Sequence, residues 1–238
     1  AGGSAREGED VIFRFETLLW GGDEAAFVLP AWAVPKLLET MARTLKPCPT
    51  DERWILGGQG LTHKVGIFIT DRKTPIALAR KVAEALANSA KVPFENAPAV
   101  PNVAQIMVSE SVEPPLDIDA MNKDALARYR EYRYCEGDPR FYTLNLDKHF
   151  GAFASGLQTV QSQPGGLPRS QLYSILRGTD PAIAFERSRA SDECKAVFGL
   201  ECFGAGAKNP LLPYQRIAEL LDYFPAVDET VATEAQVA

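Results

Sequence analysis

The chain has 238 residues, of which 46% are hydrophobic, and its formal net charge at pH 7 is −6. This length and apolar content are enough to bury a core in one large domain or two small ones, so no disulfide scaffold is needed. The acidic balance excludes a protein that coats nucleic acid with its whole surface, because neutralising phosphates requires clustered Lys and Arg.

The apolar segments do not indicate a membrane protein. No apolar run approaches the roughly 20 residues that a helix needs to cross a bilayer. Residues 1–10 have neither a basic flank nor an apolar secretory core. We therefore expect a cytoplasmic or otherwise intracellular protein. Because the first residue is not Met, a removed targeting peptide is also compatible with the sequence.

The first strands and helix are expected between residues 11 and 45. Residues 11–20 alternate apolar and polar side chains, which predicts a strand with one face buried. A turn at Gly21-Gly22-Asp23 precedes a second short strand over 26–29. Residues 34–45 then place apolar side chains on one helical stripe. This part therefore has the order strand, strand, helix.

The same order recurs after Pro47-Cys48-Pro49. Residues 53–56 and 65–70 are predicted strands joined by a glycine-rich connection, and Thr74-Pro75 is typical of a helix start. The helix is expected over 76–90. Two such units suggest an internal ββα duplication with a shared four-stranded sheet. Two ordinary hairpins that share this order by coincidence are the interpretation we prefer.

The second half is expected to be mainly helical. A fifth strand over 103–112 ends before Pro114-Pro115, where we place a domain boundary. Helices are predicted over 117–134, 149–161, 172–176, 183–189, 192–198 and 213–224, with one strand-like run over 141–146. Asp180-Pro181 adds a capping side chain followed by proline, which is a signal of a helix start. The predicted fold class is α+β: a flexible N-terminus (1–10), a ββα-ββα-like mixed sheet part (11–115), a largely helical C-terminal part (116–227) and a disordered acidic tail (228–238).

The glycine-rich connection is a candidate anion-binding loop. It comprises Gly57, Gly58, Gln59, Gly60 and Lys64. Its backbone N–H groups can approach an anion, and the lysine adds charge. However, the spacing fits neither a P-loop nor a dinucleotide fingerprint, so we interpret the loop as a structural hairpin.

The tripeptide Gly57-Gly58-Gln59 resembles the one with which peptide-chain release factors act on peptidyl-tRNA. The resemblance covers these three residues alone, and the flanking segment is not strongly basic. We therefore assign the chain to no family on this motif.

The predicted helix over 117–134 carries a candidate nucleic-acid surface. One flank collects Lys123, Arg130, Arg133 and Tyr134, and Arg140 follows after a turn. Cations beside an aromatic ring can hold phosphate and stack a base. An ordinary solvated flank with salt bridges is the simpler interpretation, which we favour.

Catalytic and metal-binding signals are weak. Only His63 and His149 offer an imidazole, and we interpret both as structural or surface residues. The four cysteines have no zinc spacing, so we expect reduced thiols, and a nucleophile such as Cys135 remains an open alternative. No cofactor or metal is implied, and catalytic residues cannot be named.

These observations lead to three functional hypotheses. The first is a non-catalytic structural or assembly subunit of a larger oligomer or multiprotein particle, with other protein subunits or further copies of the chain as partners. The second is an RNA-binding subunit that uses the basic and aromatic helix. The third is an enzyme whose site is assembled from distant residues.

Overall fold

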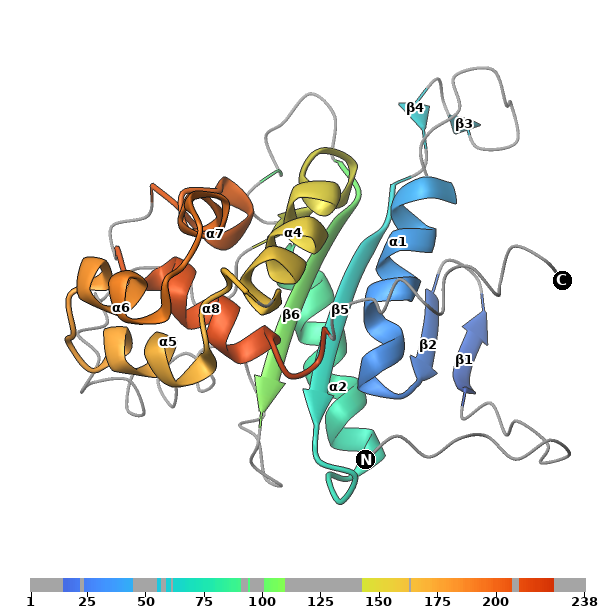
Figure 1. The fold of residues 1–238 in the computed structure, drawn as a ribbon. Helices are drawn as coiled ribbons and strands as arrows, with labels where there is room; N and C mark the ends of the chain where they lie inside the picture. Colours follow the sequence, from blue (N-terminus) through green and yellow to red (C-terminus); the bar gives the residue numbers. More distant parts are fainter. Residues whose placement is uncertain are drawn as a thin grey trace, which may run out of the picture.

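The computed structural model describes residues 15–21, 24–44, 55–56, 59–60, 62–90, 94, 101–109, 143–162, 164–206 and 210–224. Figure 1 shows strands and helices in the N-terminal part and, from residue 143 onward, a group of helices. The predicted α+β class, with a sheet-containing part followed by a largely helical one, is confirmed.

The chain begins its described part with a hairpin and a helix. Strands β1 (Glu16–Gly21) and β2 (Glu24–Val28) pair antiparallel, and η1 (Ala31–Ala33) leads into α1 (Val34–Thr44). The predicted order of strand, strand and helix is confirmed. The predicted burial of one strand face is wrong, because Phe15 and Thr17 belong to that face and both are exposed, Phe15 to 47%.

A parallel strand pair forms the centre of the molecule. Strands β5 (Lys64–Thr70) and β6 (Val103–Ser109) are in register along their whole length, and α2 (Ile76–Ala90) connects them. This is a βαβ unit, in which the crossover helix packs back on the sheet. The short strand β7 (Leu144–Asn145) joins the other side of β6 antiparallel.

The described strands do not form the shared four-stranded sheet. Strands β3 (Ile55–Leu56) and β4 (Gln59–Gly60) make their own small hairpin, so the described strands lie in three separate sheets. Strand β5 pairs with β6 and not with β3. The physical reason is visible in its sequence: the unbroken apolar run from Val65 to Ile69 suits a parallel strand covered on both faces, not a half-exposed hairpin strand.

The helices of the C-terminal part begin at recognisable capping residues. The Asn145 side chain caps α4 (Leu146–Gln161), Asp180 caps α6 (Pro181–Ser188), and Ser191 caps α7 (Asp192–Val197). The predicted start at Asp180-Pro181 is therefore confirmed. The remaining elements are α5 (Arg169–Leu176), η5 (Glu201–Phe203) and α8 (Leu212–Leu220).

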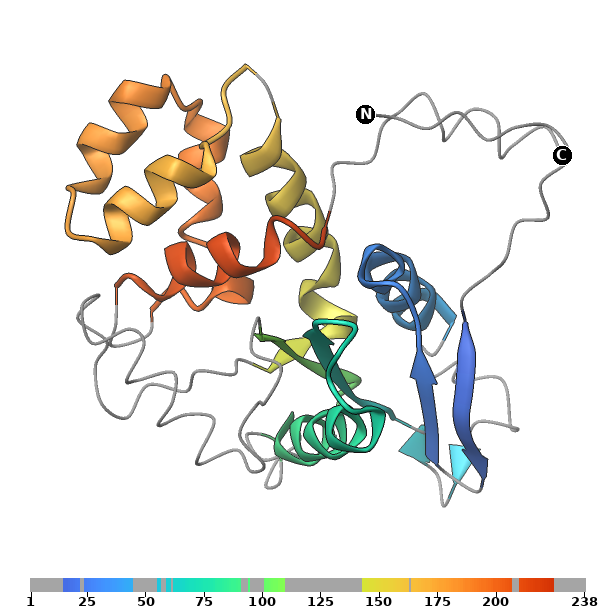
Figure 2. The ribbon, with the colours of Figure 1, turned by 90° about the horizontal axis from the view of Figure 1, so that it is seen from below.

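Two groups of buried side chains hold these layers together. On one face of the sheet, Val82 and Leu86 of α2 pack with Met107 of β6. On the other face, side chains of α1, β5 and β6 share a larger core with α4 and the C-terminal helices. Figure 2 shows α2 on the opposite side of the strands from α1 and α4. The predicted apolar stripe of α4 lies in this core: Phe150, Phe153, Leu157 and Val160.

Several predicted segments lie outside the described residues. These are the N-terminus (1–10), the domain boundary near residue 115, the helix over 117–134 and the tail over 228–238. Predictions about them stay predictions.

Candidate functional site

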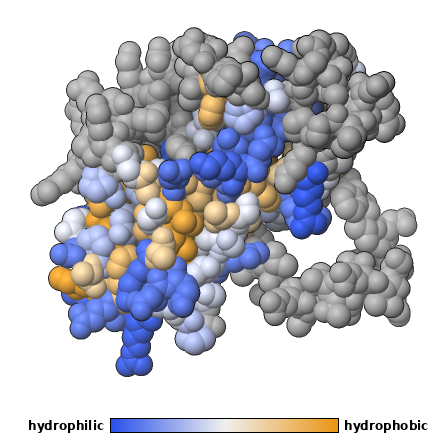
Figure 3. Space-filling model, turned by 90° about the horizontal axis from the view of Figure 1, so that it is seen from above, coloured by the Kyte–Doolittle hydropathy of each residue, from blue (hydrophilic) through white to orange (hydrophobic). Residues whose placement is uncertain are grey.

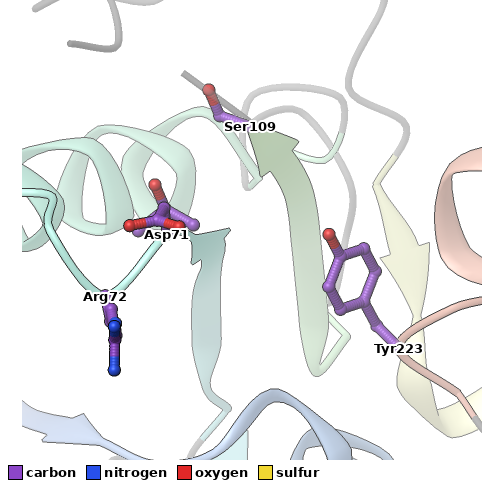
Figure 4. Close-up of a pocket in the computed structure, with 5 residues that line it drawn as sticks. Asp71, Arg72, Ser109 and Tyr223 are labelled. Atoms are coloured by element: carbon purple, nitrogen blue, oxygen red, sulfur yellow. The ribbon is translucent and has the colours of Figure 1, made fainter. Parts of the chain in front are cut away.

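A surface pocket lies at the carboxyl ends of the two parallel strands. Its volume is about 410 Å³, and Thr70, Asp71, Arg72, Ser109 and Tyr223 line it. Figure 4 shows that these residues come from the end of β5, the end of β6 and the segment that follows α8. The carboxyl end of parallel strands is the usual ligand position in open α/β sheets.

Short-range hydrogen bonds shape the β5 side of this pocket. The Asp71 carboxylate accepts a hydrogen bond from the Lys73 backbone N–H over 2.8 Å, which fixes the turn into α2. The hydroxyl oxygens of Thr70 and Thr74 are 2.8 Å apart. The Thr74 hydroxyl, expected to cap the helix, is therefore engaged with the strand end.

The described lining groups can bind a polar molecule. They offer three hydroxyls, one carboxylate and one guanidinium, and neither a histidine nor a cysteine is among them. Hydrogen bonding and charge pairing with a small polar ligand are thus the chemistry that this pocket supports. Sequence reasoning missed the pocket because its residues are far apart in the chain.

A buried asparagine joins the opposite, amino-terminal ends of the strands. Asn102 is 1% exposed, and its side-chain carbonyl accepts a hydrogen bond from the His63 backbone N–H over 2.8 Å. Its side-chain amide donates to the Asp147 carboxylate over 2.9 Å, and its backbone N–H donates to the same carboxylate. The His63 ring nitrogen Nδ1 is 3.3 Å from the Asn102 oxygen. His63 is thereby held beside a structural link between β5, β6 and α4.

The second histidine and the two described cysteines have surroundings that are typical of structural residues. His149 of α4 has its Nε2 atom 3.5 Å from the Glu201 carboxylate. Cys194 and Cys202 are buried free thiols, and burial raises the pKa of each to about 11. Each thiol is therefore protonated near neutral pH, where a nucleophilic cysteine would need to be a thiolate. No group of three or more His, Cys, Asp or Glu side chains suited to a metal ion occurs among the described residues.

The predicted anion-binding loop is described only in part. Gly57 and Gly58 lie outside the described residues, whereas Gln59 and Gly60 form β4. Lys64 is exposed at the start of β5, and its ammonium donates a hydrogen bond to the Asn88 side chain of α2 over 2.6 Å. In this structure the lysine thus bridges the strand to its crossover helix.

The predicted nucleic-acid flank lies entirely outside the described residues. This applies to Lys123, Arg130, Arg133, Tyr134 and Arg140, and also to Cys135.

Large apolar side chains are exposed on the first hairpin and the turn after it. Phe15, Trp20, Val28 and Trp32 are 47%, 78%, 37% and 65% exposed, and we call the first two, which share a ring contact with Phe27, the aromatic hairpin surface. The Phe15 and Trp20 rings both contact Phe27, with ring centroids 5.0 and 5.8 Å apart. Only Ile76 and Ile183 are comparable elsewhere in the described part of the chain. On the face of Figure 3, hydrophobic side chains of the described residues lie interspersed with hydrophilic ones.

Among the helices that the structure describes, none combines the length and the apolar character needed to cross a membrane. Comparison of the chain with protein-family models, with curated proteins and with solved structures found no match.

Proposed function

We propose that this chain is a non-catalytic assembly subunit of a larger oligomer or multiprotein particle. The observation that supports the proposal is the aromatic hairpin surface. Four of the six large hydrophobic side chains exposed in the described residues fall between residues 15 and 32. Scattered exposed apolar residues are ordinary, but a contiguous apolar patch is typical of an interaction site, and the Phe15 and Trp20 rings are joined through Phe27.

The residue types strengthen this interpretation. Trp and Phe are enriched at protein interfaces, and buried Trp side chains are frequent contributors to binding energy. A two-stranded hairpin is at best marginally stable in water by itself. The hairpin of β1 and β2 pairs with no further strand in the described residues. A partner that covers its aromatic side chains would therefore stabilise both the hairpin and the complex.

Exchanging the exposed tryptophans tests the assembly role. The full chain and the double variant Trp20→Ser, Trp32→Ser are purified from source cells, and their masses and co-purifying proteins are compared. The unmodified chain is expected in a complex, and the double variant is expected as a monomer. Ile183→Ser is the matched control, because Ile183 is 44% exposed but lies on α6. A chain that is monomeric at high concentration and without co-purifying proteins contradicts the proposal.

The pocket favours a second candidate function, an enzyme or ligand-binding protein whose site is assembled from distant residues. Its groups come from residues 70–72, 109 and 223, as that hypothesis requires. Because the lining holds the opposite charges of Arg72 and Asp71, a small polar ligand is expected whose anionic group pairs with Arg72. A thermal-shift screen with inorganic phosphate, carboxylates and nucleotides tests this, with Arg72→Ala expected to remove any stabilisation. If none of these compounds raises the melting temperature, this second candidate function is rejected.

A further inference from the structure

We infer that the aromatic hairpin surface binds a short, uncharged, proline-rich segment of a partner protein. The inference rests on the proposed assembly function and names the kind of segment that the partner supplies. Strand register, ring contacts and the placement of charges in the hairpin carry it.

A β-bulge in β1 brings the aromatic side chains of the hairpin onto one face. The register shifts between Thr17 and Leu19, which leaves Leu18 as the extra residue of the bulge. Thr17 pairs with Phe27, and Trp20 pairs with the residue two positions before Phe27. Paired residues project from the same face of a sheet, and a bulge shifts the alternation by one residue. Trp20 therefore shares the face of Thr17 and Phe27, although an odd number of positions separates it from Thr17.

The ring contacts agree with this placement and describe the shape of the surface. The Phe27 ring centroid lies 5.0 Å from that of Phe15 and 5.8 Å from that of Trp20. The corresponding ring planes are inclined by 34° and 66°. Because the three rings are not coplanar, a flat ligand cannot stack on all of them at once. The surface suits a partner that presents small, separate apolar groups.

The face that bears these rings carries no charged side chain in the described strands. Thr17 and Ala25 lie on it and are exposed, whereas the register places Glu16 and Glu24 on the opposite face. Nucleic-acid phosphates would find no cation here to neutralise them. A Lys or Arg side chain would lose hydration without gaining a carboxylate partner. The complementary surface of the partner is therefore uncharged.

The size of the aromatic hairpin surface favours a short segment over a folded domain or a second copy of the chain. Phe15 is 47% exposed and Trp20 is 78% exposed. Since an aromatic side chain buries about 150–250 Å², these exposed fractions provide roughly 300 Å². A stable interface between folded proteins needs about 800 Å² on each side. In a multiprotein particle, several contacts of the smaller size act together through avidity.

Proline-rich segments have the properties that this surface selects. A polyproline II segment is uncharged and already extended before it binds, so it loses little conformational entropy. Its pyrrolidine rings are compact apolar groups, and the threefold helix presents them one at a time. Aromatic surfaces of several unrelated domains recognise such segments. The inclined rings of the hairpin can thus each pack against a different proline.

A titration with a synthetic peptide tests the binding in the intact chain. The indole N–H signals of the 3 tryptophans are followed by NMR, and the signal that is lost in Trp20→Ser identifies Trp20. Decaproline should shift this signal saturably, and a Gly-Ser peptide of equal length should not. By calorimetry, Trp20→Ser should raise the dissociation constant for decaproline at least about tenfold. The matched control, Ile183→Ser on α6, should retain the affinity of the unmodified chain.

Three results of the titration overturn the inference. The first is a Trp20 signal that decaproline does not shift, and the second is equal binding of the two peptides. The third is a Trp20 signal that moves on dilution without peptide, because a second copy of the chain would then occupy the surface. Circular dichroism checks the fold of each variant, and Phe15→Ser replaces Trp20→Ser if the latter does not fold.

Crosslinking then identifies the natural segment. A photo-crosslinking phenylalanine analogue replaces Thr17 in source cells, with Ile183 as the control position. The segment that crosslinks from position 17 and not from the control is sequenced by mass spectrometry. It is expected to be rich in proline and to belong to another protein. A segment without proline, or one from this chain, contradicts the inference.

The outcomes separate this inference from the assembly function. If the tryptophan double variant loses its partners but the crosslinked segment contains no proline, the assembly function stands and the proline-rich segment is rejected. If the chain binds decaproline but neither self-associates nor co-purifies with another protein, the assembly function fails and the peptide-binding surface stands.

Discussion

Gly66 leaves no room for a side chain where β5 meets α2. A Cβ atom at this position would lie 1.8 Å from the Ala83 carbonyl oxygen and 2.6 Å from the Ala87 nitrogen. Both atoms belong to the backbone of α2, so they cannot move aside as a flexible side chain could. The helix as a whole would have to retreat from the strand, and its packing on the sheet would loosen.

We predict that Gly66→Ala lowers the free energy of unfolding by about 3 kcal/mol, because overpacking forces this backbone displacement. The matched control is Gly151→Ala on α4, where a Cβ atom would meet nothing within 4 Å. That change should stabilise the protein by up to about 1 kcal/mol, since Ala is the better helix former. Urea unfolding of both variants provides the measurement. Equal stability of the two would contradict the close approach of α2 to β5.

At the scale of elements, Asn102 determines how three of them meet. Its side chain bonds to the start of β5 and to the first turn of α4, while its own backbone leads into β6. The Asp147 carboxylate at the start of α4 also suits the positive end of the helix dipole. This small polar network therefore fixes the ends of these elements relative to one another.

We predict that Asn102→Asp destabilises the protein by about 3 kcal/mol, because it places a buried carboxylate against Asp147. Adding Asp147→Asn should restore at least half of the loss, since an amide then faces a carboxylate again. Asp147→Asn alone is the control for the lost helix charge. Chemical denaturation of the four proteins gives the coupling energy. A double variant no more stable than Asn102→Asp would show that the two side chains are not coupled.

The elements differ in how far local sequence determines them. The span of α2 and the cap of α6 follow from signals within a few residues, so both could be predicted. The partner of β5 could not, because pairing depends on β6, which lies beyond an intervening helix. The Asn102 network joins residues 39 and 45 positions apart, which no local pattern reveals. The exposure of Phe15 was missed because apolar alternation normally indicates a buried face.

At the scale of the whole molecule, most of the larger core lies in the C-terminal part. The thiols of Cys194 and Cys202 belong to this core. Cys194 of α7 is 0% exposed and Cys202 of η5 is 4% exposed. Burial raises the pKa of both from an ordinary value of 9.0 to about 11. Above pH 9 the unfolded chain releases these protons, whereas the folded chain retains them. Since the unfolded state then binds fewer protons, the free energy of unfolding falls as pH rises from 9 to 11.

We predict that replacing both cysteines by alanine flattens this part of the pH profile. The variant loses some stability at every pH because of the cavities that remain. The relevant quantity is therefore the slope of the free energy of unfolding between pH 9 and 11, measured by urea unfolding. Tyr214, whose pKa burial also raises, is present in both proteins and cancels in the comparison. Identical slopes would show that the thiols do not titrate with folding.

The packing of α1 against α4 has a consequence for the order of events on the ribosome. Helix α1 ends at Thr44, whereas α4 starts only at Leu146, so the nascent chain exposes the first long before the second exists. Synthesis proceeds from the N-terminus, and contacts between distant segments form late because a long loop must close. The contact that anchors the hairpin and α1 to the helical part is thus delayed. A subunit that joins during translation would meet a hairpin whose orientation is not yet set.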